Sequence, residues 1–187
     1  NISDAISVIQ NIDNYIDNLY FPFDNDNLWR MRINLISDDE NNPNPNKYPE
    51  LSHTENSHII YEQIKENLIP YTFYGIDYEP IQNSDGLLHA ELTSDLIENI
   101  NSGAALINYI GHGNEFLWAE ERILDENSID NWINRSKIPL LVSATCEFGK
   151  FDNPLITSGG ELMIKKGDGQ SGSVDNPDII ISISPKK

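Results

Sequence analysis

Residues 104–113 read AALINYIGHG, and residues 138–146 read IPLLVSATC. Each is a short apolar run bounded by turn residues, a pattern typical of strands that are buried on both faces of a parallel sheet. The first run ends in Gly111-His112-Gly113, and the second ends in Thr145-Cys146. The two runs therefore predict strands of one sheet that carry a histidine and a cysteine at their carboxyl ends.

The segments around these runs predict alternating helices and strands. Apolar residues recur near the helical period over residues 3–19, 54–68 and 91–100, and a short helix is expected around Ile129, Trp132 and Ile133. Residues 28–36 alternate apolar with polar side chains, and residues 71–78 are rich in aromatic ones, so both are expected to be strands. This order predicts an α/β fold, with a mainly parallel sheet flanked by helices on both faces.

One domain is expected over residues 1–166. Residues 41–49 are rich in Asn and Pro and predict a loop. Residues 167–187 begin with a flexible, linker-like composition and continue into a short strand-like tail, which belongs to this domain or to a neighbouring module. Residues 1–12 show no targeting signal, so we expect either a cytosolic protein or a leader outside this chain.

Charge and cysteine content exclude several classes of function. The 187 residues carry 12 basic and 30 acidic side chains, a net charge of −18, which disfavours binding to nucleic acid. A single cysteine cannot form an internal disulfide, and it cannot build a cysteine-rich zinc site. The remaining expectation is that Cys146 is either a buried apolar side chain or a reactive thiol.

The positions of His112 and Cys146 favour a nucleophile and its base. Successive parallel strands end at the same edge of a sheet, where ligands of open α/β folds bind. A free thiol is only a few per cent ionised at neutral pH, and an adjacent imidazole can take its proton. The Gly113 and Cys146 amides could then form an oxyanion hole. The alternatives are a small buried Cys and an ordinary Gly-His-Gly turn.

Several longer motifs resemble those of the gingipain family, in the caspase-like clan of cysteine peptidases. NYIGHGNE at 108–115, followed by Trp118, is similar to the histidine motif of the family. Four further motifs look like signatures of its PorU branch: WAEE at 118–121, ATCEF at 144–148, FDNP at 151–154 and SGGE at 158–161. Over about residues 6–166 the chain is most similar to the PorU branch, the signal peptidases and sortases of type IX secretion. The resemblance implies a three-layer sandwich, a dyad of Cys146 and His112, and an oxyanion hole at Gly113.

The same resemblance implies roles for several acidic residues and one tryptophan. Asp38 matches the acid that orients the histidine, although a cap or loop acid is the alternative. Glu55 lies near the acid that selects a basic residue in some gingipains, although a solvated first-turn Glu is equally compatible. Trp118 and Glu147 are expected to contact substrate.

No cofactor is expected to be required, but the acidic segment of Asp38, Asp39 and Glu40 makes calcium possible. His53, His58 and His89 have no partner that the sequence reveals.

The function implied by the resemblance is a sortase at the outer-membrane surface. It would cut the carboxyl-terminal sorting domain from secreted cargo through an acyl-enzyme and pass the cargo to an amine of anionic lipopolysaccharide. Its partners would be the cargo proteins, an outer-membrane barrel and other proteins of the attachment complex. The alternatives are a secreted endopeptidase that only hydrolyses and a non-catalytic subunit that binds cargo. Complete PorU proteins are several times longer, and the chain departs from the family pattern after Gly167.

Overall fold

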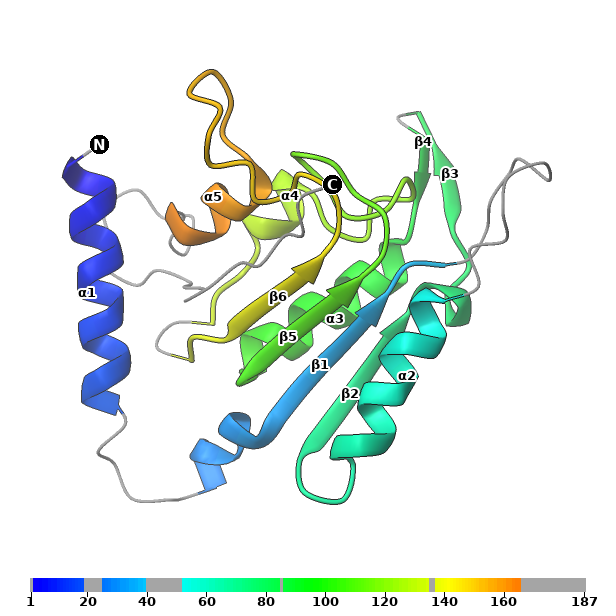
Figure 1. The fold of residues 1–187 in the computed structure, drawn as a ribbon, viewed down its shortest axis with the longest axis horizontal. Coiled ribbons are helices and arrows are strands. Elements are labelled where there is room, and N and C mark those ends of the chain that lie inside the picture. The colour runs from blue at the N-terminus through cyan, green and yellow to red at the C-terminus, as the bar shows by residue number, and fades with distance from the viewer. Residues whose placement is uncertain (1, 19–24, 40–51, 85, 135–136, 166–187) are drawn as a thin grey trace.

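A four-stranded parallel sheet forms the centre of the computed structural model, which describes residues 2–18, 25–39, 52–84, 86–134 and 137–165 (Figure 1). Its order is β2-β1-β5-β6, and all three pairings are parallel. The strands are β1 (Arg32–Ser37), β2 (Ile69–Tyr74), β5 (Leu106–Ile110) and β6 (Leu140–Ala144). The predicted α/β fold with a mainly parallel sheet is confirmed.

Helices cover both faces of this sheet. On one face, α2 (His53–Ile64) packs through Ile60, Tyr61 and Ile64 against a cluster that contains Ile33 and Leu35 of β1. On the other face, α3 (Ala90–Ser102) buries Leu92, Leu96 and Ile100 in the larger core. Figure 1 shows α2 in front of the sheet and α3 behind it. Alternate residues of β1 serve opposite faces because side chains of a strand alternate in direction.

Shorter elements connect these layers. They are the 3-10 helices η1 (Asn25–Met31) and η2 (Gly75–Asp77), the antiparallel pair β3 (Ile81–Asn83) and β4 (Gly86–Leu88), and the helices α4 (Glu126–Ile129) and α5 (Gly159–Lys165). The strand predicted over residues 28–36 is wrong for its first part, since residues 28–31 belong to η1. The pairing register sets this boundary, because the first residue of β1 that pairs with β2 is Arg32, which lies opposite Ile69.

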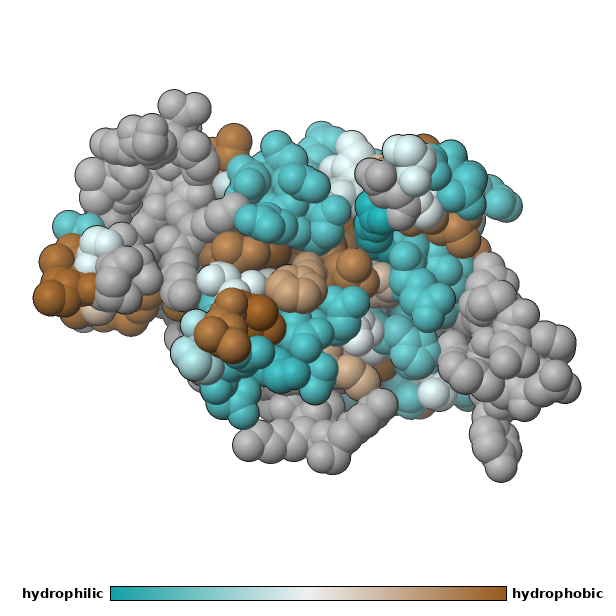
Figure 2. All heavy atoms as spheres, turned by 90° about the horizontal axis from the view of Figure 1, so that it is seen from above, coloured by the Kyte–Doolittle hydropathy of each residue, from teal (hydrophilic) through white to brown (hydrophobic). Residues whose placement is uncertain are grey.

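The amino-terminal helix α1 (Ile2–Asn18) confirms the predicted helix. Its isoleucines are exposed at positions 2, 6, 9, 12 and 16. Hydrophobic spheres gather at the end of the molecule where α1 lies (Figure 2). Within the described ranges, no helix combines the length and apolarity that crossing a membrane requires. Glu40, the predicted loop at 41–49 and the predicted tail at 167–187 lie outside the described residues.

The chain order reverses between β1 and β5, the two central strands of the sheet. From β1 the chain moves to β2 on one side, and it later returns to β5 on the opposite side of β1. Such a reversal leaves a gap between the loops that follow the two central strands, where α/β proteins bind their ligands. Asp38 follows β1 directly, and His112 follows β5.

Candidate active site

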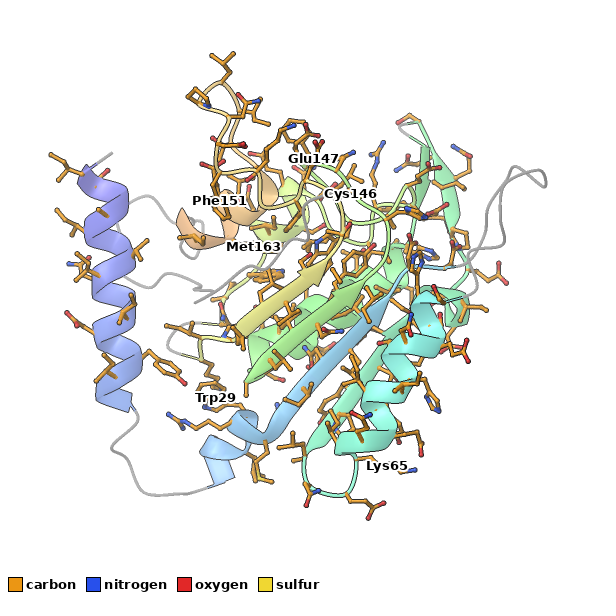
Figure 3. All side chains as sticks on the ribbon, in the orientation of Figure 1. Trp29, Lys65, Cys146, Glu147, Phe151 and Met163 are labelled. Atoms are coloured by element: carbon orange, nitrogen blue, oxygen red, sulfur yellow. The ribbon has the colours of Figure 1, made fainter. Side chains whose placement is uncertain are left out.

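The histidine loop and the cysteine loop lie side by side at this carboxyl edge. Ile110 pairs with Ala144, so His112 and Cys146 each stand two residues beyond a matched pair of strand residues. A side chain added at Gly113 would meet Thr145 Oγ1 at 2.6 Å, which shows how closely the two loops pack. His112 is exposed, and Cys146 is a partly buried free thiol above the end of β6 (Figure 3).

Three aromatic side chains support the histidine loop from below. Tyr109 stacks on Trp118 with ring centroids 4.3 Å apart, and Phe148 packs against Trp118 at 5.4 Å. The Tyr109 hydroxyl donates to the His112 carbonyl oxygen at 2.6 Å, and burial raises the pKa of Tyr109 well above its usual value. Trp118 is fully buried, so its side chain cannot contact a substrate as expected; it supports the loop instead.

Asp38 holds the backbone of His112. Its Oδ2 accepts a hydrogen bond from the His112 amide at 3.0 Å. One of its carboxylate oxygens also lies within 4.8 Å of a nitrogen of the His112 imidazole. Only 2% of Asp38 is exposed, and this burial raises its pKa from 3.8 to about 7, although the hydrogen bond from His112 opposes the change. The structure thus places the predicted orienting acid beside the histidine.

Two further acids complete a buried group around Asp38. Carboxylate atoms of Asp38, Asp39 and Glu121 lie within 4.8 Å of one another, and His89 Nε2 is 3.7 Å from Asp39 Oδ2. Burial raises the pKa of Glu121, and the nearby Asp39 adds to the effect. The sequence predicted a group of Asp38, Asp39 and Glu40, whereas Glu121 comes from the loop after β5. Three carboxylates are ligands that suit Ca²⁺.

Two backbone amides beside Cys146 and His112 have the freedom that an oxyanion hole requires. Neither the Gly113 nor the Cys146 amide donates a hydrogen bond to another residue in the described ranges. Glu147, directly after Cys146, has a φ of 54°, in the left-handed region that costs a non-glycine residue about 1–3 kcal/mol. Strain of this kind at the cysteine loop is typical of functional sites.

An ion-pair network ties the two loops together. Lys150 Nζ lies 2.9 Å from Glu115 Oε1 on the histidine loop and 3.2 Å from Glu147 Oε1 beside Cys146. The hydrogen bond with Lys150 lowers the pKa of Glu115 and raises that of Lys150. Glu147, expected to contact substrate, is therefore also a partner of Lys150. Glu55 is exposed in the first turn of α2.

Sequence reasoning missed several residues near these loops. His53, the first residue of α2, makes an edge-to-face ring contact with His112. Phe116 on the histidine loop is 48% exposed and offers apolar surface to a peptide. Phe151 on the cysteine loop is 53% exposed and does the same (Figure 3). The two loops are joined again where the Gly159 amide donates to the Glu115 carbonyl oxygen at 2.7 Å.

Comparison with known proteins identifies the family. The family model described as "Peptidase family C25" matches residues 1–176, which is most of the chain. The chain belongs to peptidase family C25. The gingipain resemblance of its histidine and cysteine motifs agrees with this C25 membership. No curated protein is a significant sequence match to the chain.

Solved gingipain structures share the fold of this C25 chain. One is the Arg-specific cysteine proteinase gingipain R (RgpB), with a TM-score of 0.62 and 17% identity over 91% of this chain and 35% of that one. Another is the complex of Porphyromonas gingivalis RgpB pro- and mature domains, with a TM-score of 0.63 and 18% identity over 92% of this chain and 37% of that one. This chain therefore spans little more than a third of the gingipain chains that it matches. Its fold is caspase/gingipain-like.

Proposed function

We propose that this C25 chain carries the catalytic centre of a cysteine peptidase, with Cys146 as nucleophile and His112 as acid and base. The observation that carries the proposal is the register of β5 and β6. Because Ile110 pairs with Ala144, the thiol and the imidazole emerge from adjacent loops at the edge where α/β proteins bind ligands. A histidine beside a cysteine at such an edge has the arrangement of an activated nucleophile.

The reaction follows from these groups. His112 takes the Cys146 proton, and the thiolate attacks the scissile carbonyl carbon to form a tetrahedral intermediate. The Gly113 and Cys146 amides donate to the oxyanion, and one such donor typically contributes about 3–4 kcal/mol. The intermediate collapses as His112 returns its proton to the leaving amine, which leaves a thioester on Cys146. A second nucleophile, water or an amine, then gives up a proton to His112 and releases the thiol.

Asp38 positions the histidine in this scheme. It binds the His112 amide rather than acting on substrate directly, and its carboxylate lies near the imidazole. A carboxylate close to an imidazole can hold the ring in the orientation in which it accepts the thiol proton. Lys150 complements this role by holding the histidine loop against the cysteine loop.

We further propose that the enzyme is a sortase of the PorU kind in type IX secretion, at the outer-membrane surface. The support for this choice within the family is the resemblance of the motifs at 118–121, 144–148, 151–154 and 158–161 to signatures of the PorU branch. The substrates would be cargo proteins with a carboxyl-terminal sorting domain, and the acceptor an amine of anionic lipopolysaccharide. An outer-membrane barrel and further attachment proteins would be the partners. The chemistry requires no cofactor, and calcium would serve structure alone.

The experiment that tests the sortase compares the two second nucleophiles. Full-length protein, with its partner proteins, is incubated with a cargo tail and a graded concentration of a simple amine or the native acceptor. Mass spectrometry then reads the new carboxyl terminus of the cargo. An amine-linked product that rises with acceptor concentration is expected, because positioning a nucleophile can be worth about 7–11 kcal/mol. Hydrolysed product at every acceptor concentration favours the plain endopeptidase, and no cleavage favours the binding subunit.

A further inference from the structure

A second imidazole lies directly against that of His112. The ring centroids of His53 and His112 are 5.1 Å apart, and the ring planes meet at 86°. His53 is partly buried, whereas His112 is exposed, so the pair is reached from solvent through His112. Imidazole is the commonest metal ligand in proteins, and two of them at one place offer two nitrogen ligands.

Asp38 adds a carboxylate to this pair. One ligand atom from each of Asp38, His53 and His112 lies within 4.8 Å of the other two. Asp38 is almost fully buried, and its Oδ1 accepts no hydrogen bond within the part of the chain that the structure describes. A buried carboxylate oxygen without a donor is costly, and a bound cation would remove that cost.

The three ligands come from separate elements that are fastened together. The hydroxyls of Ser37, at the end of β1, and Thr54, in the first turn of α2, are hydrogen-bonded at 3.1 Å. This contact fixes the start of α2 beside the end of β1 (Figure 1). His53 is the first residue of α2 and is therefore fixed there too. The hydrogen bond from the His112 amide to Asp38 fixes the third element. The ligands are therefore held near one another before any ion binds.

We propose that Asp38, His53 and His112 form a site for a divalent transition-metal cation of the zinc type, and that the bound ion withdraws His112 from Cys146. Two imidazoles and one carboxylate suit Zn²⁺, which binds such ligands at about 2.0–2.2 Å. Tetrahedral ligands of one zinc ion lie about 3.3–3.6 Å apart, so side-chain rotations that bring the three ligand atoms from within 4.8 Å to this spacing complete the site. The adjoining group of Asp38, Asp39 and Glu121 offers only oxygen and suits Ca²⁺ instead.

Zinc bound here would inhibit the peptidase, because an imidazole nitrogen that ligates metal cannot accept the thiol proton. This inhibition rests on the proposed function, whereas the binding of zinc does not. A direct binding measurement therefore separates failure of the metal site from failure of the peptidase assignment.

The test uses calorimetry on full-length protein that carries Cys146→Ala, so that the thiol cannot hold the ion. Zn²⁺ is the probe, and Ca²⁺ is titrated in parallel. Relative to this background, His53→Gln should weaken the zinc site by more than about 100-fold, beyond the 10–100-fold typical of losing an outer-shell partner. His58→Gln, five residues along the same helix, is the matched control and should leave zinc binding unchanged. In protein that retains Cys146, zinc should inhibit the His53→Gln variant much less than the wild type, and His58→Gln as much as the wild type. Each rate with zinc is compared with the rate of the same variant without metal.

Several outcomes would overturn the site. These are no zinc binding to the Cys146→Ala protein, equal zinc affinity with and without His53, or zinc binding that Ca²⁺ displaces and that depends on Glu121 instead. If the His53→Gln protein does not fold, zinc anomalous diffraction from crystals of the Cys146→Ala protein decides. A peak between Asp38, His53 and His112 supports the site, and a peak elsewhere contradicts it.

Discussion

Replacing Asp38 with Asn should change the stability of the centre of the sheet, relative to the wild type, in a favourable direction as the pH rises from about 5 to about 7. Burial raises the pKa of Asp38 from 3.8 to about 7, so the folded protein holds this proton more tightly than the unfolded chain does. The wild-type protein therefore loses stability as the pH rises from about 4 to about 7, while an Asn is indifferent to pH. Between pH 5 and pH 7, the wild-type free energy of unfolding should fall by at most about 2.7 kcal/mol relative to that of the Asn variant.

Hydrogen exchange gives this quantity in the full-length protein, because it reports local opening free energies element by element. Peptides from β1 and β5 are followed at several pH values, with exchange rates corrected for the intrinsic effect of pH. The opening free energy of Asp38→Asn minus that of the wild type should rise between pH 5 and pH 7. The control is Asp152→Asn, which removes an exposed carboxylate on the cysteine loop. A difference that does not change with pH for Asp38→Asn would refute the claim that burial holds its proton.

Two other substitutions test the loops that carry His112 and Cys146. Lys150→Met should lower turnover about 10-fold with little change in melting temperature, since surface ion pairs stabilise weakly and a displacement of about 1 Å can cost 100-fold in rate. Lys65→Met breaks a comparable pair at the end of α2 and should leave turnover unchanged. Equal turnover in both variants would contradict the role of the network. Gly113→Ala should lower kcat about 100-fold or more, because the new methyl group would lie 2.6 Å from Thr145 Oγ1 and displace an oxyanion donor. A kcat within twofold of the wild type would remove Gly113 from the oxyanion hole.

The strands that are followed by His112 and Cys146 could be predicted because their signal is local. Each is an apolar run of strand length that ends at a turn residue, and the parallel register then fixes where the next residues emerge. The antiparallel pair β3 and β4 was not predicted, since strands of three residues with exposed side chains leave no apolar pattern. The isoleucines of α1 show a second limit of prediction from sequence. Their helical period predicts a helix with an apolar face, but it does not predict whether that face is buried.

The residues around His112 could be predicted only in part, for a topological reason. Asp38 was implied by the resemblance to the gingipain family, and its place agrees with the topology because it directly follows β1, whose end shares an edge with the end of β5. His53 begins a helix, and its place beside His112 depends on α2 crossing back over β1 and β5, which no local pattern reveals. Glu121 joins Asp38 and Asp39 in the same way, from a loop that turns back under the histidine. Trp118 was misassigned because an aromatic residue near a catalytic motif is compatible with the core as well as with substrate.

The most direct test of the catalytic pair is the rate at which iodoacetamide alkylates Cys146 in the full-length, folded protein near neutral pH. An unassisted thiol is only a few per cent ionised there, so a base that takes its proton raises the rate substantially. We expect His112→Ala to slow the alkylation of Cys146 by about 10-fold or more. His58→Ala, an exposed histidine on α2, should leave the rate unchanged. Equal alkylation rates in the wild type and His112→Ala would show that His112 does not activate Cys146, and would contradict the proposed catalytic centre.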